Sequence, residues 1–238
     1  MPDKPFKNIY RPGKGNVKLP FVEARKSKEG RNYISAFELL KKDLKTIFEY
    51  IEPVGNNFRA FSHRLFELLL RACMENEANC INIIIQNTAS LGEINILRYS
   101  DLEGPMKLSE YKVKCQWIDY PEFSPFESFA ISERNKRSPL WYRDYNAVKH
   151  NRVDNFEKAT LDNVIQAIGA VYVILSAQYA PWFDEPAARR VMGLDPLRVG
   201  MFVLTQEPEW DEVNQYEYNW HDLKQTADPY DYHSIPII

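Results

Sequence analysis

The sequence predicts a mainly α-helical protein, an up-down bundle of four to five helices around one core. Apolar residues recur at intervals of three and four over long stretches, which is the period of amphipathic helices. The composition, with 45% apolar and 26% charged residues, is typical of a globular protein, and 238 residues are enough to bury one sizeable core. Strand-like sequence is confined to short segments.

Composition divides the chain into three parts. Residues 1–31 hold nine Lys or Arg and no apolar period, so we expect an arm on the surface that adds little to the core. Residues 32–183 form the helical bundle, with an irregular insertion at about 92–139. Residues 184–238 form a C-terminal extension that we expect to pack on the bundle or on a partner subunit.

The first helix of the bundle begins near Ser35 and stops at Pro53 and Gly55. Its apolar side is Phe37, Leu40, Leu44, Ile47, Phe48 and Ile51. The second helix, at 57–88, is the longest and should span the whole domain.

A polar ladder runs along the second helix, opposite its apolar arc. It consists of His63, Glu67, Arg71 and Glu75 at four-residue spacing. Such a ladder is typical of a solvated face. The other interpretation is a polar seam beside a functional groove, in which Arg71 and Glu75 are binding residues.

The insertion is broken by several Gly and Pro, and we expect at most one short helix, near 108–114. Its aromatic residues are too many for a free linker, so it should pack on the bundle, with room for a short strand. They are Trp117, Tyr120, Phe123, Phe126 and Phe129.

Two more helices follow the insertion. One begins at Ser138-Pro139, a cap followed by Pro in the first turn, and runs to about Arg152. The next extends from about Asn155 to Tyr179 and is apolar almost all round, so it belongs in the middle of the bundle.

The extension contains one strand-like segment, at 199–205, and an acidic, aromatic end. Residues 207–231 contain eight Asp or Glu and one Lys, interleaved with Trp and Tyr, including Trp220 and Tyr230. Aromatic residues at this density indicate docking against the bundle or another subunit.

Charge and cysteine content narrow the classes of function. The net charge of −3 gives no overall positive field, so any nucleic-acid binding must be local. No export signal or membrane span is recognisable, which favours the cytoplasm. Cys73 and Cys80 lie about 10 Å apart on one helix, beyond disulfide reach, so we expect reduced core thiols. The sequence has no metal-ligand or cofactor motif, and we expect neither group.

The chemistry-bearing motif lies in the helix after Pro139. Helical spacing places Arg143, Asn146, Ala147 and His150 on one face. A guanidinium and an amide offer hydrogen-bond donors to a phosphate, and imidazole is the side chain that titrates near neutral pH. This set suits cleavage of an RNA phosphodiester. On spacing alone, however, such a His is more often a hydrogen-bonded structural residue than a catalyst.

Two stretches resemble the HEPN superfamily of helical bundles. They are Ser-Pro-Leu-Trp-Tyr-Arg-Asp-Tyr-Asn-Ala-Val-Lys-His-Asn-Arg at 138–152 and Arg-Leu-Phe-Glu-Leu-Leu-Leu-Arg-Ala-Cys-Met-Glu-Asn-Glu-Ala at 64–78. The likeness covers roughly residues 35–180. Many members of that superfamily are metal-independent RNases of toxin and phage-defence systems, and they act as dimers. The resemblance therefore implies RNA, a second copy of the chain, and an antitoxin or other partner protein as partners.

Carried over to this chain, the resemblance assigns the catalytic His to His150 and the polar residue four positions earlier to Asn146. The Arg that usually precedes this polar residue is replaced by Tyr145. Arg143 fits the longest spacing of the family, with six residues between it and His150. This departure leaves two hypotheses, an active variant and a relative that retains the bundle without cleaving.

In the first hypothesis, Arg143, Asn146 and His150 form the catalytic set, and Lys149 and Arg152 supply positive charge beside Tyr145. Basic residues at 134–152 support a local RNA site. Because the extension is acidic, a further hypothesis is that it covers this basic site within the same chain. In the second, the helix builds a dimer interface of a non-catalytic interaction, nucleotide-binding or RNA-binding module. Asn146 and His150 are then buried hydrogen-bonding residues.

Overall fold

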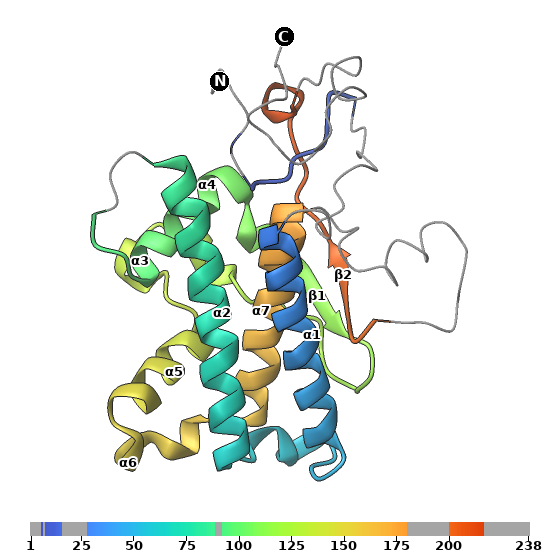
Figure 1. Cartoon of the computed structure of the whole chain (residues 1–238), viewed down its shortest axis with the longest axis vertical. Helices are drawn as coiled ribbons and strands as arrows, with labels where there is room; N and C mark the ends of the chain where they lie inside the picture. Colours follow the sequence, from blue (N-terminus) through green and yellow to red (C-terminus); the bar gives the residue numbers. More distant parts are fainter. Residues whose placement is uncertain (1–5, 7, 16–27, 89–91, 180–199, 217–238) are drawn as a thin grey trace.

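Over the residues that the structure describes, the fold is mainly helical, with one small sheet (Figure 1). The computed structural model describes residues 6, 8–15, 28–88, 92–179 and 200–216. Its principal helices are α1 (Lys28–Phe48), α2 (His63–Asn87), α5 (Leu140–His150) and α7 (Leu161–Tyr179). Successive principal helices reverse direction (Figure 1), and a backbone bridge between Phe61 and Thr160 places the starts of α2 and α7 at the same end.

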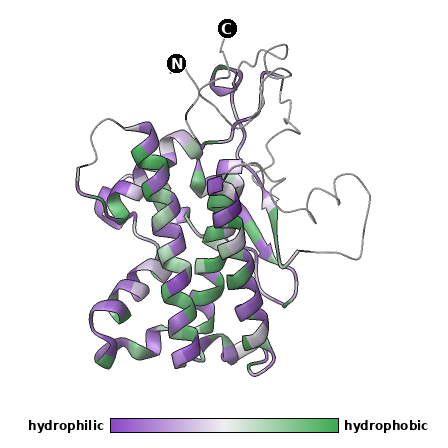
Figure 2. Cartoon of the chain, viewed as in Figure 1, coloured by the Kyte–Doolittle hydropathy of each residue, from purple (hydrophilic) through white to green (hydrophobic). Residues whose placement is uncertain are grey.

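Helix α7 forms the centre of the bundle, as its apolar circumference predicts. Nearly every residue from Leu161 to Tyr179 is buried, and the helix is apolar along most of its length (Figure 2). It is long and apolar enough to cross a membrane, but 89% of its most apolar window is buried inside the protein. That burial is consistent with the core helix of a soluble domain.

Several helix boundaries differ from the prediction because local capping decides them. Residues Gly55–Arg59 form a 3-10 turn, and α2 begins later because the Ser62 side chain accepts a hydrogen bond from the Leu65 N–H at 3.2 Å. After α5, Asn151 caps the short helix α6 (Arg152–Asn155). A 3-10 turn at Phe156–Lys158 then delays the start of α7.

The insertion packs on the bundle, as predicted from its aromatic content: Tyr120, Phe126 and Phe129 are buried. It contains the short helices α3 (Ile96–Tyr99) and α4 (Glu103–Met106). The expectation of a helix near 108–114 is wrong, because a 3-10 turn at Leu108–Glu110 leads directly into a strand. The 3-10 turns Glu127–Ala130 and Arg134–Lys136 complete the insertion.

The sheet joins the insertion to the extension. Strand β1 (Lys112–Cys115) pairs antiparallel with β2 (Phe202–Gln206), and Cys115 lies opposite Phe202. The strand predicted at 199–205 is present as β2, which begins three residues later and ends one residue later. The short strand for which the insertion left room is β1, at a position that the sequence did not predict. The remaining extension, 180–199 and 217–238 with Trp220 and Tyr230, lies outside the described residues.

The expectation that the N-terminal arm adds little to the core is wrong for residues 8–13. It is also wrong for residues 28–31, which form the first turn of α1 and include the buried Gly30. Ile9 is fully buried in the core, and Arg11 is only 5% exposed. The Tyr10 N–H donates to the Ala177 carbonyl at 2.8 Å, and Gly13 forms a bridge with Tyr216. The arm is held by main-chain bonds to distant residues, which no apolar period in the arm itself could reveal.

Candidate functional site

Helix α5 carries the predicted motif, and its amphipathic pattern fixes which side chains face outward. Trp141, Tyr142, Tyr145 and Val148 are buried. The indole N–H of Trp141 donates to the Pro125 carbonyl at 2.9 Å, which ties the first turn of α5 to the insertion. The opposite face is therefore left to solvent.

That outward face is the Arg–His stripe, which we define as Arg143, Asn146, Ala147 and His150. Arg143 and His150 are exposed, while Asn146 and Ala147 are half-buried. Within the described part of the chain, the side chains of Arg143 and His150 form no hydrogen bond or ion pair. The structure thus brings the predicted catalytic residues onto one accessible face and leaves two of them free to bind a ligand.

A polar seam between α5 and α2 lies beside the stripe. The Tyr142 hydroxyl donates to Glu77 Oε1 at 2.7 Å. Lys149 Nζ donates to the Tyr145 hydroxyl at 3.0 Å and lies 5.0 Å from the centre of that ring. Burial, and then the Glu77 carboxylate, raise the pKa of both tyrosines. Both phenols therefore stay protonated and bind α5 to α2.

Tyr145, expected from the sequence to be a binding residue, belongs to this seam and not to the surface. Its side chain is 1% exposed and lies in the core cluster. It is out of reach of a ligand, so its place among the expected binding residues is not supported. Lys149 is exposed, but its ammonium group donates a hydrogen bond to the Tyr145 hydroxyl, which holds the Lys149 side chain against α5.

Arg71 and Glu75 are not brought to the stripe. They lie on the side of α2 that faces α1, where Arg71 forms an ion pair with Asp43. Glu75 is half-buried, and burial raises the pKa of its carboxyl group. Arg71 and Glu75 thus lie at the border between α2 and α1, on the other side of α2 from Glu77 and α5. Arg71 and Glu67 line the groove between those two helices, while His63 is exposed at the start of α2.

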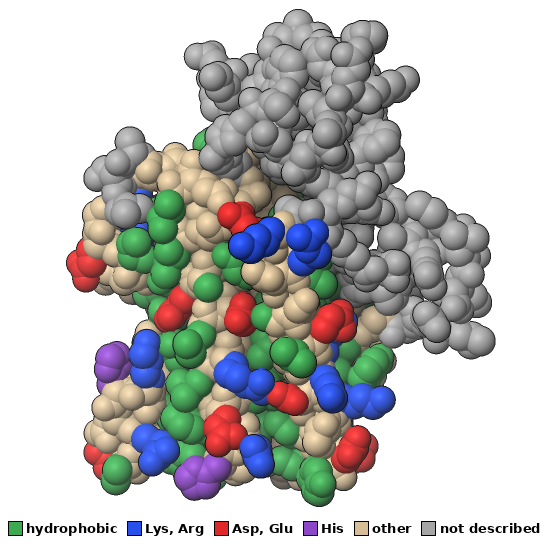
Figure 3. Space-filling view, viewed as in Figure 1, with side chains coloured by type: hydrophobic (Ala, Val, Ile, Leu, Met, Phe, Trp, Pro, Cys, Tyr) green, Lys and Arg blue, Asp and Glu red, His purple; other side chains and the backbone are tan. Residues whose placement is uncertain are grey.

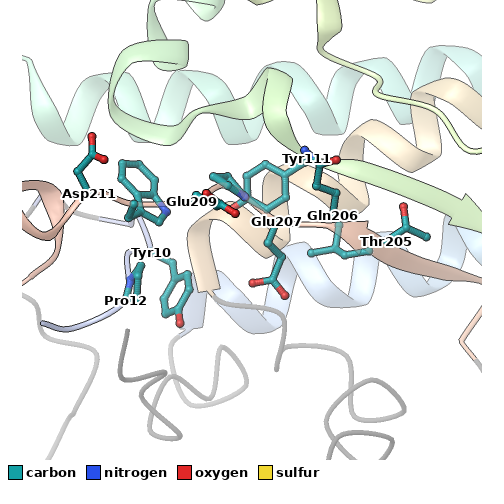
Figure 4. Close-up of a pocket in the computed structure, with 11 residues that line it drawn as sticks. Tyr10, Pro12, Tyr111, Thr205, Gln206, Glu207, Glu209 and Asp211 are labelled. Atoms are coloured by element: carbon teal, nitrogen blue, oxygen red, sulfur yellow. The ribbon is translucent and has the colours of Figure 1, made fainter. Parts of the chain in front are cut away.

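Two pockets, of about 650 and 620 Å³, lie away from α5. One, of about 650 Å³, is a groove between α1 and α2 with an apolar floor that includes Ile47 and Leu68. The other, of about 620 Å³, lies beside the extension and is lined by Glu207, Glu209 and Asp211 together with aromatic rings (Figure 4). Its carboxylates make it unsuitable for RNA phosphates.

The described part of the acidic extension does not cover α5. It lies at the opposite end of the bundle from α6 (Figure 1). On the face seen in Figure 3, basic and acidic side chains are interspersed, so no strong field of one sign develops there. On that face, attraction of RNA would come from a few residues. Arg152 is exposed two positions after His150.

Glu77 and Tyr142 are the residues of this region that sequence reasoning missed. The sequence pattern indicated no role for Tyr142, and Glu77 lies between Cys73 and Cys80 on α2. A carboxylate flanked at three- and four-residue spacing by buried thiols was the available signal, since such a group needs hydrogen-bond donors from a neighbouring helix.

Comparison of this chain with protein-family models, with curated proteins and with solved structures finds no match in any of the three.

Proposed function

We propose that this protein is a HEPN-like, metal-independent endoribonuclease of the cytoplasm that cleaves RNA as a homodimer. The observation that supports the proposal is that the side chains of Arg143 and His150 are exposed and have no hydrogen-bond or ion-pair partner among the described residues. Other polar residues of α5 are engaged: Tyr142 with Glu77, Lys149 with Tyr145, and Asp144 with Asn163. Arg143 and His150 stay exposed on one stripe without a partner among the described residues.

These groups suit cleavage through the neighbouring ribose. The 2′-oxygen attacks phosphorus while a base removes its proton, and the bond from phosphorus to the 5′-oxygen breaks as an acid protonates the leaving oxygen. An imidazole serves in either role, and a guanidinium stabilises the charge of the phosphorane. The products are a 2′,3′-cyclic phosphate and a 5′-hydroxyl, and no metal ion or oxidant is consumed.

A second copy of the chain completes this site in the proposal. One subunit contributes a single imidazole on an open helix face, whereas the reaction uses both a base and an acid. Leu140, 60% exposed, and Ala147 provide apolar surface on the same side of α5 as Arg143 and His150. Pairing two α5 helices would cover these groups and bring the two stripes together.

The alternative is a non-catalytic module that binds RNA, a nucleotide or a partner protein such as an antitoxin through the same face. Tyr145 in place of Arg favours it, because the usual guanidinium is missing. Its version with a buried His150 is not supported, since that side chain is exposed. In this alternative, the stripe binds its ligand but leaves the phosphodiester intact.

The test uses purified protein and a labelled single-stranded RNA in excess EDTA. We expect cleavage without added metal, products ending in a 2′,3′-cyclic phosphate, and no cleavage of the same strand made of 2′-deoxynucleotides. Lys42→Ala, an exposed change on α1, is the matched control and should cut like the parent. Intact RNA at every enzyme concentration would reject the ribonuclease and leave the binding module.

A further inference from the structure

A cluster of aromatic and cationic side chains lies at the end of the bundle where α2 begins and α6 crosses. We call it the aromatic platform. Its members are Phe61, His63, Phe66, Arg152 and Phe156. They come from two chain segments that are far apart in sequence, and the second of these begins two residues after His150.

Phe156 is the centre of the platform. Its ring centroid lies 4.7 Å from that of His63, with the planes tilted by 40°, and 5.6 Å from that of Phe61, with the planes nearly perpendicular. Phe66 lies 6.3 Å away, and the Arg152 guanidinium lies 5.5 Å from the centre of the Phe66 ring. The rings therefore support one another and hold the guanidinium in place.

The platform is partly open to solvent, since Phe66 and Phe156 are half-buried and its other members are exposed. Phe61 is 49% exposed, and His63 and Arg152 are exposed as well. The core cluster is built without Phe61. Contiguous exposed aromatic side chains mark interaction sites, and the π-face of any nucleobase stacks on such rings.

Both arginines and carboxylates border the platform. Arg152 is exposed, as are Arg59, two residues before Phe61, and Arg64, the residue after His63. Arg64 and Glu67 compensate each other in an ion pair at 3.1 Å, and the carboxylates of Asp154 and Glu157 are exposed. Arg152, which lies against the Phe66 ring, is therefore the cation of the platform that a phosphate would meet. Stacking surface interleaved with cations is the arrangement that holds single-stranded nucleic acid.

We infer that the aromatic platform is a base-binding subsite for single-stranded RNA, next to the Arg–His stripe. The inference rests on the proposed function and extends it by naming where a base adjacent to the cleaved bond would lie. Arg152 then holds a phosphate between the stripe and the platform, and Phe61 and His63 stack on the base. Since stacking reads no hydrogen-bond pattern, the subsite selects unpaired RNA and tolerates different bases.

The experiment measures binding by fluorescence anisotropy, in the full chain carrying His150→Ala and in EDTA, so that the strand is not cut. The probe is a short 5′-labelled single-stranded RNA. Phe61→Ala should weaken its binding by about 5- to 100-fold, as expected for loss of one stacked base. Phe61→Trp, which keeps an aromatic face, should bind like the parent.

Three comparisons make the result specific. Tyr50→Ala removes another exposed aromatic ring, which lines the groove between α1 and α2, and should leave binding unchanged. Duplex RNA, and a strand with abasic riboses, should bind weakly and show no dependence on Phe61. Unchanged melting temperatures would show that the variants are folded.

The inference is overturned if the parent binds no single-stranded RNA, if Phe61→Ala binds as tightly as Tyr50→Ala, or if the abasic strand loses as much affinity as the normal strand on substitution. Its failure is distinct from that of the proposed function. Binding that depends on Phe61 without cleavage supports the subsite and rejects the ribonuclease, whereas cleavage with Phe61-independent binding does the reverse.

Discussion

The guanidinium of Arg11 lies 4.3 Å from the centre of the Trp210 ring, and so a residue near the start of the chain holds one near its end. Arg11 also donates through Nε and Nη2 to the Pro105 carbonyl, at 3.2 and 2.8 Å, and through Nη1 to the Asn214 carbonyl. Lys107 approaches the same indole ring at 5.3 Å. The N-terminal segment, the insertion and the extension therefore meet at one buried side chain.

Replacing that side chain should loosen all three segments. We expect Arg11→Ala to lower the free energy of unfolding by about 2 to 4 kcal/mol, because two carbonyls lose charged donors and Trp210 loses its cation. Urea unfolding followed by fluorescence checks this. Arg59→Ala, an exposed arginine on the turn before α2, is the matched control and should change stability by less than about 0.5 kcal/mol. Equal stabilities of the two variants would contradict the role of Arg11.

The seam between α2 and α5 should depend on the hydroxyl of Tyr142. Tyr142→Phe keeps the buried ring but removes the donor to Glu77, so stability should fall by about 1 to 3 kcal/mol. Thermal melting at neutral pH measures the loss, and Tyr50→Phe, whose ring is exposed, should melt like the parent. A Tyr142→Phe protein as stable as the parent would mean that Glu77 finds another donor.

Glu75 gives the protein a predictable response to pH. Because burial raises the pKa of this carboxyl group in the folded state, the folded protein binds its proton more readily than the unfolded chain does. Stability from this group is thus greatest in acid and declines as the pH rises from the unfolded pKa, near 4.3, through the raised folded value.

Glu75→Gln removes this decline of folding stability with rising pH, because the amide does not ionise. The variant should melt at a higher temperature than the parent at pH 7, and the advantage should vanish below about pH 4, where the carboxyl group is protonated in both states. Melting scans across this range test it, with Glu38→Gln on the exposed face of α1 as control. An advantage of the same size at both ends of the range would contradict the account.

The proposed dimer can be tested through an added thiol. All three native cysteines are buried, and burial raises the pKa of Cys115 to about 11, so they should not react in the folded protein. Ala147→Cys should then give a disulfide-linked dimer on mild oxidation, whereas Lys42→Cys on α1 should stay monomeric. Non-reducing electrophoresis distinguishes the two. Equal cross-linking of both variants would indicate random collision, and none would place Ala147 away from the interface.

The long helices were predictable from the sequence. Burial on one side of a helix makes apolar residues recur every three or four positions, and burial all round α7 makes nearly all of its residues apolar. The outward direction of Arg143 and His150 followed from the same spacing. The burial of Ile9 and Arg11 did not, since their partners are Ala177, Pro105 and Asn214, far along the chain. The apolar arc of α2 likewise shows which residues are buried, but not which neighbouring helix each polar border meets. The structure shows that Arg71 and Glu75 face α1 and that Glu77 faces α5, and the sequence of α2 alone did not distinguish these two sides.

The central claim is that His150 serves chemistry and not the fold. The most direct measurement determines the melting temperature and the RNA cleavage rate of His150→Ala in one preparation, beside the parent. The account predicts an unchanged melting temperature, because the side chain is exposed and has no partner within the described residues, and a cleavage rate at least about 100-fold lower. Cleavage at the parental rate, or a large loss of stability, would contradict it.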